Sequence, residues 1–139
     1  MKEKIIQFGT GNFLRGFADQ FIDELNKKDL FDGSIVIVSP TDSKNTDKIN
    51  AQHGKYHLIL RGIDGGKEVY ETKRIDSVSR AVNPYRDFSG FLALAKDPDL
   101  RYIISNTTES GIAFDDSCAF SDSPASSFPG KKTQFMFER

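Results

Sequence analysis

Hydrophobic and polar positions along the first 38 residues predict a strand, a helix and a second strand. Lys4–Phe8 is a short β-rich run that stops at a glycine. From Phe13 to about Lys28, apolar side chains recur at steps of three and four residues, which predicts one amphipathic helix with Asn12 as its N-cap. Ser34–Val38 is an unbroken apolar, β-branched run, typical of a parallel strand that is covered on both faces. The apolar stripe of the helix consists of Phe13, Leu14, Phe17, Ala18, Phe21, Ile22 and Leu25.

The middle of the chain departs from this alternating plan. Tyr56–Ile63 and Val69–Val78 are β-rich and flank Asp64-Gly65-Gly66, so we expect an inserted β-hairpin. The polar segment Pro40–Gly54 that leads into it is interpreted as a loop or a short helix.

The last third of the chain returns to helices and strands. Pro84 is suited to the first turn of a helix over Tyr85–Lys96. Arg101–Ser105 is a further candidate for a buried strand, and a polar turn follows it. A loop rich in Ser, Asp and Pro is predicted over Asp115–Pro129, and a helix over Lys131–Arg139.

Composition narrows the class of protein. A length of 139 residues fits one soluble domain. The chain has 19 Lys and Arg against 20 Asp and Glu, and this near-neutral balance argues against binding to nucleic acid. No apolar stretch approaches the ~18 residues of a membrane span. The one cysteine, Cys118, forms no internal disulfide, and the start of the chain lacks a secretory pattern, so we expect a cytoplasmic protein. Two histidines and one cysteine give no metal-binding spacing, so no metal site is predicted.

The segment between the first strand and the first helix carries the strongest chemical signal. It reads Gly9-Thr10-Gly11-Asn12-Phe13-Leu14-Arg15-Gly16. In dinucleotide-binding proteins, one glycine of such a turn permits tight bending and a second lets pyrophosphate approach the backbone near a helix start. The third glycine of the usual pattern falls on Leu14, and Gly16 comes two residues later. The alternative interpretation is a glycine turn that binds nothing.

The acidic residue that usually holds the ribose is missing directly after the second strand. Asp42, or the hydroxyls of Ser39 and Thr41, are the candidates for that role. Asp42 has a second interpretation, as a cap of a turn or of the next helix. The sequence therefore says less about which cofactor is bound than about the binding of a cofactor as such.

Ser105-Asn106-Thr107-Thr108-Glu109 follows a predicted parallel strand, at the edge where open α/β sheets bind ligands. The same residues also fit a helix-capping turn. Arg15, near the start of the first helix, either faces a phosphate or is solvated.

No residue of the chain shows the pattern of a catalytic acid or base. His53 and His57 lie in a polar stretch and are interpreted as surface residues. Lys131 and Lys132 have no recognisable partner in the sequence. Cys118 has no neighbouring His and no Cys-x-x-Cys pattern, so we expect an ordinary thiol.

Three segments in this order resemble the mannitol dehydrogenase family of long-chain polyol and sugar-acid dehydrogenases. They are Ile5–Phe17, Ser105–Ile112 and Pro124–Lys131, and the resemblance runs in the same order across essentially the whole chain. Leu14-Arg15 after Gly-x-Gly-Asn-Phe is similar to the branch of the family that acts on tagaturonate, whereas the mannitol and mannonate branches tend to carry His-Arg there. The displaced third glycine agrees with the family pattern.

The resemblance implies a Rossmann-type α/β fold with a mostly parallel sheet flanked by helices, over residues 1–139. It implies NAD as the cofactor and interconversion of tagaturonate and altronate by hydride transfer in hexuronate breakdown. The residues expected at the cofactor are Ile6, Phe8, Gly9, Thr10, Gly11, Asn12, Phe13, Leu14, Arg15, Gly16, Ser39, Asp42, Asn106, Thr107 and Thr108.

In the family, the catalytic Lys and the His and Asn residues that position substrate come from a mainly helical C-terminal domain. The chain ends at Arg139 within a predicted helix, so we expect it to be the cofactor part of a longer enzyme, with no catalytic residue of its own. Three alternatives remain at this point: a non-catalytic nucleotide-binding or regulatory module, a related fructuronate or mannitol-type dehydrogenase domain, and a Rossmann domain for another ligand such as S-adenosylmethionine.

Overall fold

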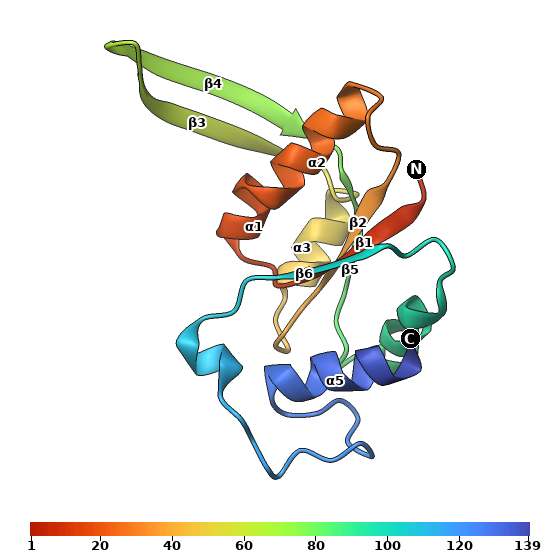
Figure 1. The fold of residues 1–139 in the computed structure, drawn as a ribbon. Helices are drawn as coiled ribbons and strands as arrows, with labels where there is room; N and C mark the ends of the chain where they lie inside the picture. Colours follow the sequence, from red (N-terminus) through yellow and green to blue (C-terminus); the bar gives the residue numbers. More distant parts are fainter.

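The computed structural model describes residues 1–139, except for the side chain of Ser110. Four parallel strands form its central sheet, with helices on both faces (Figure 1). The strand order is β5-β2-β1-β6. The α/β architecture expected from the sequence is therefore confirmed. The strands are β1 (Glu3–Phe8), β2 (Ser34–Val38), β5 (Val78–Val82) and β6 (Tyr102–Ser105). β6 lies at the edge of the sheet with Tyr102 and Ile103 exposed, so the prediction that this strand is buried was wrong.

Two apolar clusters, one on each face of the sheet, form the core. Val36 and Val38 of β2 belong to one cluster and Ile35 and Ile37 to the other, and all four are fully buried. One face packs against α4 (Phe88–Ala93), the 3-10 helix η1 (Leu94–Lys96) and α5 (Phe128–Glu138). The other face packs against α2 (Ala18–Lys27) and α3 (Asn45–Ala51). Burial on both faces explains why β2 is apolar throughout.

An aromatic group around Phe8 joins β1 to α5. The Phe8 ring meets the rings of Phe91, Phe128 and Phe135 edge to face, with centroids 6.2, 5.8 and 5.7 Å away. This geometry suits the quadrupoles of the rings and fixes α5 beside the carboxyl end of β1.

The single helix expected over residues 13–28 is broken in two, and this prediction was wrong. α1 spans Asn12–Gly16, α2 begins at Ala18, and Gly11 rather than Asn12 holds the N-cap position. A continuous helix would use the Arg15 carbonyl to accept from the amide of Asp19, but here that carbonyl accepts from the Tyr56 hydroxyl at 2.6 Å. The break is thus stabilised by a side chain that is distant in sequence.

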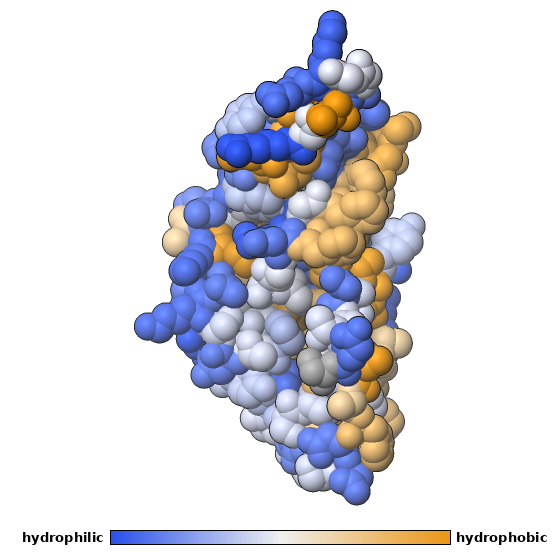
Figure 2. Space-filling view, turned by 90° about the vertical axis from the view of Figure 1, so that its left-hand side faces the viewer, coloured by the Kyte–Doolittle hydropathy of each residue, from blue (hydrophilic) through white to orange (hydrophobic). Residues whose placement is uncertain are grey.

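Part of the apolar stripe on α1 and α2 lies on the surface. Phe13, Phe17, Phe21 and Leu25 are exposed. The rings of Phe13 and Phe17 stack at 5.5 Å, and those of Phe17 and Phe21 meet at 4.7 Å. Figure 2 shows hydrophobic side chains gathered along the right-hand edge of its view, at the height of these helices.

The predicted hairpin is present as β3 (Tyr56–Asp64) and β4 (Lys67–Ile75), and it projects away from the sheet (Figure 1). Its turn is the pair Gly65-Gly66, both with positive φ (55° and 78°), as a tight hairpin turn requires.

The second β-rich run does not continue to Val78 as one strand, contrary to the prediction. The amide of Asp76 donates to the Asp23 carboxylate at 2.8 Å, so it forms no hydrogen bond of the β3–β4 pairing, which ends at Ile75. The chain then turns, and β5 joins the parallel sheet beside β2 instead.

The bounds of two helices also differ from the predicted ones. α4 begins at Phe88 and is capped by Asp87, whose carboxylate accepts from the amide of Gly90, so Pro84 precedes the helix. α5 begins at Phe128 and is capped by Ser127, so the predicted loop ends earlier than expected. The polar segment 40–54 contains α3, the short-helix alternative. None of the helices in the described residues is long and apolar enough to cross a membrane.

Candidate functional site

The carboxyl ends of β1 and β6 lie side by side at one edge of the sheet. Phe8, the last residue of β1, pairs with Val38 of β2 on one side and with Ser105 of β6 on the other. From β1 the chain proceeds to β2, whereas β6 lies on the opposite side, so the order of strands reverses here. Open parallel sheets bind ligands in the crevice at such a reversal.

The turn after β1 is held in a conformation that needs glycine. Gly9 has φ 129° and its amide donates to the Val38 carbonyl at 3.0 Å, which ties the turn to the end of β2. The Gln7 side chain donates to the Gly9 carbonyl at 3.2 Å. The next glycine, Gly11, faces open space, since no heavy atom lies within 4 Å of where a Cβ would be. A ligand can therefore approach the backbone at Gly11.

Arg15 and Asn12 sit at the start of α1, beside this turn. The Arg15 guanidinium donates to the Asn12 side chain and lies over the Tyr56 ring, 5.7 Å from its centroid. Arg15 is half-buried, so the structure places it between the surface and the base of the hairpin.

A buried polar group lies beneath the turn, which the sequence alone did not indicate. Asp19 is fully buried, and its Oδ2 accepts from the Tyr56 hydroxyl at 3.2 Å. Burial raises the pKa of Asp19 from 3.8 to about 7, and the Tyr56 hydroxyl and Arg15 charge oppose that rise. Burial and the Asp19 carboxylate also raise the pKa of Tyr56. This group couples α1, α2 and the hairpin below the candidate site.

Two of the three candidates for holding the ribose, Ser39 and Asp42, differ in their surroundings. Ser39 is fully buried and donates to the Thr41 carbonyl at 2.7 Å. Asp42 is exposed, and its Oδ1 accepts from Asn83 at 2.9 Å and from Arg86 at 3.3 Å. Both side chains are therefore engaged within the protein.

Asn45, at the start of α3, was not singled out in the sequence. Its amide lies 3.4 Å from the Thr10 hydroxyl and so joins α3 to the glycine turn. A polar residue in a segment of loop or short helix gives no signal that it faces another loop, so only the fold reveals this contact.

The loop after β6 forms the second wall of the crevice. Asn106 is exposed and Thr107 half-buried. The Lys132 ammonium donates to the hydroxyls of Ser105 and Thr107, each at 3.1 Å. The Thr108 carbonyl accepts a hydrogen bond from the Gly111 amide, just before the 3-10 helix η2 (Glu109–Ile112). Lys132 had no recognisable partner in the sequence because α5 returns to this edge only in the folded chain.

The other predicted cofactor residues divide between core and surface. Ile6, Phe8 and Leu14 are buried, so their side chains support the turn from within. Phe13 is exposed. A Cβ on Gly16 would lie 3.5 Å from a methyl carbon of Leu58, an ordinary contact, so packing does not require glycine there.

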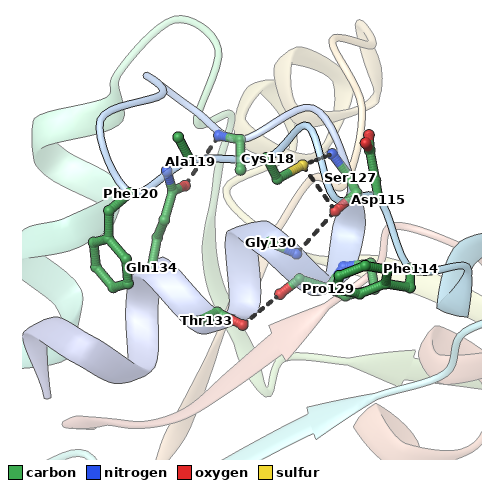
Figure 3. Close-up of a pocket in the computed structure, with 11 residues that line it drawn as sticks. Phe114, Asp115, Cys118, Ala119, Phe120, Ser127, Pro129, Gly130, Thr133 and Gln134 are labelled. Atoms are coloured by element: carbon green, nitrogen blue, oxygen red, sulfur yellow. Dashed lines mark hydrogen bonds between the residues drawn. The ribbon is translucent and has the colours of Figure 1, made fainter.

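A separate pocket of about 200 Å³ lies between α5 and the loop before it. Figure 3 shows Cys118 and Ser127 side by side in its wall. The hydroxyls of Ser126 and Ser127 lie 3.3 and 3.2 Å from the Cys118 sulfur, and the Ser127 amide donates to it at 3.4 Å. These contacts lower the pKa of the Cys118 thiol, although neither a His nor a second Cys is involved. The expectation of an ordinary thiol is corrected in this respect.

Comparisons of this chain with family models and with known proteins agree with one another. The model for the mannitol dehydrogenase Rossmann domain matches residues 3–138. Altronate oxidoreductase of Bacteroides thetaiotaomicron is 50% identical over 137 residues, which are 99% of this chain and 29% of that protein. The Bacillus subtilis protein of the same name is 45% identical over 99% of this chain and 28% of its own length. The chain thus spans less than a third of these relatives.

A solved structure shares the fold. Mannitol 2-dehydrogenase of Pseudomonas fluorescens, in a ternary complex with NAD and D-mannitol, superimposes with a TM-score of 0.72. The two are 23% identical, and the match covers 84% of this chain and 24% of the other.

Proposed function

The chain belongs to the mannitol dehydrogenase family, as its Rossmann domain, and from this we propose that it is the NAD-binding domain of an oxidoreductase that interconverts tagaturonate and altronate. The names of the relatives at 45 to 50% identity support this substrate pair over mannitol or fructuronate. The single cysteine fits a reducing compartment, and we infer a cytoplasmic enzyme.

The observation that carries the proposal is the open approach to Gly11 next to the reversal of strand order. A dinucleotide needs its pyrophosphate close to backbone amides, and a Cβ at this position would occupy that approach. Gly9 supports the same turn through its positive φ. The residues present therefore fit NAD, which supplies the hydride acceptor when it is bound.

The proposed roles follow the two walls of the crevice. Gly9, Gly11 and Asn12 lie nearest the pyrophosphate, with Arg15 close by. Asn106, Thr107 and Thr108 line the nicotinamide side. Asp42 is the candidate for the ribose, after exchanging one of its contacts to Asn83 and Arg86. These residues bind and orient the cofactor so that the substrate carbonyl meets the ring, which lowers the entropic part of the barrier.

We further propose that the chain acts as one domain over residues 1–139 and that catalytic side chains come from elsewhere in the enzyme. The relatives are more than three times as long as the matched region, which leaves room for them. The isolated chain is then expected to bind NADH weakly and to show no turnover.

The direct experiment is a titration of the chain with NADH, followed by nicotinamide fluorescence. We expect saturable binding that NAD competes away and that S-adenosylmethionine leaves unchanged. Absence of binding at millimolar NADH would contradict the proposal. Displacement by S-adenosylmethionine would indicate a Rossmann domain for another ligand.

A further inference from the structure

Lys132 lies at the β6 wall of the crevice, in a position fixed by three contacts. Its ammonium donates to Ser105 and Thr107, each at 3.1 Å, and lies 4.3 Å from the centroid of the Phe128 ring. Phe128 in turn packs against Phe8 at the end of β1, with ring centroids 5.8 Å apart. The charge is therefore held beside the carboxyl ends of both β1 and β6.

Among the described residues, no carboxylate forms an ion pair with this ammonium. Hydroxyl oxygens accept hydrogen bonds but carry no net charge, and they occupy two of the three N–H donors of the ammonium. Partial burial lowers the pKa of Lys132, which agrees with a cation that lacks a carboxylate partner.

The preceding lysine behaves differently and serves as an internal comparison. Lys131 is buried and donates to the Ser126 carbonyl at 2.9 Å, and it lies over the Tyr85 ring at 4.9 Å from the centroid. Its charge is used within the fold. Lys132, one residue later on α5, instead presents its charge at the edge where the ligand is expected.

We propose that Lys132 is a positioning residue that binds an oxyanion of the ligand on the β6 side of the crevice. This inference rests on the proposed function, since it requires a ligand in that crevice. Two sources supply the same chemistry: a phosphate of the cofactor, or the carboxylate of the sugar acid. A half-buried ammonium with a free N–H makes a charge-assisted hydrogen bond to either.

The experiment compares two pairs of probes that differ only in the anionic group. Nicotinamide mononucleotide and nicotinamide riboside differ by a phosphate, and their binding is measured by displacement of NADH. Galacturonate and galactose differ by a carboxylate, and their binding is measured in the presence of saturating NADH. The variant Lys132→Met keeps an apolar stem over Phe128 and removes the charge.

Two further variants serve as controls. Lys2→Met removes an exposed lysine at the amino end of β1, where Lys2 pairs with Asp99 at 3.0 Å, so it tests the effect of net charge alone. Lys132→Arg keeps a cation at the site and should restore part of the binding.

We expect the wild-type chain to bind the anionic member of one pair about 3- to 10-fold more tightly than its neutral partner, a range typical of one partly exposed ionic contact. Lys132→Met should abolish that difference, and the pair affected identifies the anion. A merely structural role would weaken both members of a pair equally, which would overturn the inference. So would a wild-type chain that binds NADH but prefers neither anion, whereas a wild-type chain that fails to bind NADH contradicts the proposed function itself.

Discussion

The hydroxyl of Tyr56 lies 3.2 Å from Oδ2 of Asp19 and also donates to the Arg15 carbonyl at 2.6 Å. Tyr56, at the base of the hairpin, therefore contacts both the buried carboxyl of Asp19 beneath the glycine turn and the break between α1 and α2. Because Oδ1 of Asp19 has no hydrogen-bond partner among the described residues, ionisation of this group is poorly compensated.

Asp19→Asn should make stability less dependent on pH. The pKa of Asp19 is raised from 3.8 to about 7, so the folded state binds a proton that the unfolded state has lost. The stabilisation that this protonated carboxyl gives the folded state is complete below about pH 4 and is lost as the pH rises through about 7. Between pH 4 and pH 8 the free energy of unfolding of the wild type should fall by up to roughly 4 kcal/mol, whereas that of the variant should not show this fall. At pH 4 the two proteins should have similar stabilities.

Urea unfolding at both pH values measures this difference between the variant and the wild type. Asp64→Asn, at the hairpin tip, controls for loss of an exposed carboxylate. An Asp19→Asn effect of equal size at pH 4 and pH 8 would show that Asp19 does not titrate in this range.

Gly11→Ala should weaken NADH binding about tenfold without altering the fold. The methyl group meets no protein atom within 4 Å, but it occupies the approach of the pyrophosphate to the backbone. Gly62→Ala in the hairpin is the matched control, because a Cβ there also meets nothing within 4 Å. Binding is measured by NADH fluorescence and folding by thermal melting. Equal NADH affinity in the two variants would place the ligand elsewhere.

Cys118 should react with iodoacetamide faster at pH 7 than the same residue in the unfolded chain. The hydroxyls of Ser126 and Ser127 lower its pKa, so more thiolate is present in the folded state. Ser126→Ala removes the largest contribution and should shift the midpoint of the rate against pH upward. The rates are followed by mass spectrometry, and identical profiles for folded and unfolded chains would refute the shift.

The exposed rings on α1 and α2 should bind a hydrophobic dye. Phe13→Gln combined with Phe21→Gln should at least halve the fluorescence of anilinonaphthalene sulfonate bound to the folded chain, since a contiguous apolar surface is removed. Met136→Gln on α5 is the control, because it removes an exposed apolar side chain elsewhere. If both changes reduced the fluorescence equally, the dye would not report on this surface.

Three of the four parallel strands, β1, β2 and β6, and the hairpin could be predicted from sequence because they depend on local patterns. The unbroken apolar run of β2 and the paired glycines at 65 and 66 each specify a structure without reference to the rest of the chain. The break between α1 and α2 could not be predicted in this way, since the Tyr56 hydroxyl that stabilises it lies 41 residues away. The separation of β4 from β5 similarly depends on the buried Asp23, 53 residues from Asp76.

The same distinction applies to the candidate site. The glycine turn carries its own signature, because positive φ at Gly9 restricts the residue type. Lys132 and Asn45 carry none, since a lysine on a helix and an asparagine in the first turn of one are common on any surface. Their positions at the crevice depend on the packing of α5 and α3 against the sheet.

The topology divides the sheet equally between the two halves of the chain. β1 and β2 precede the hairpin, β5 and β6 follow it, and the Gly65-Gly66 tip lies far from the sheet (Figure 1). A single cut at that tip would give two fragments, one with the glycine turn and the other with the β6 loop and Lys132. Each fragment carries one wall of the crevice, and the nine residue pairs between β3 and β4 provide an interface for reassembly. Binding of a dinucleotide by the mixed fragments would therefore show that they have reassembled. This property would make the domain suitable as a sensor built from two fragments.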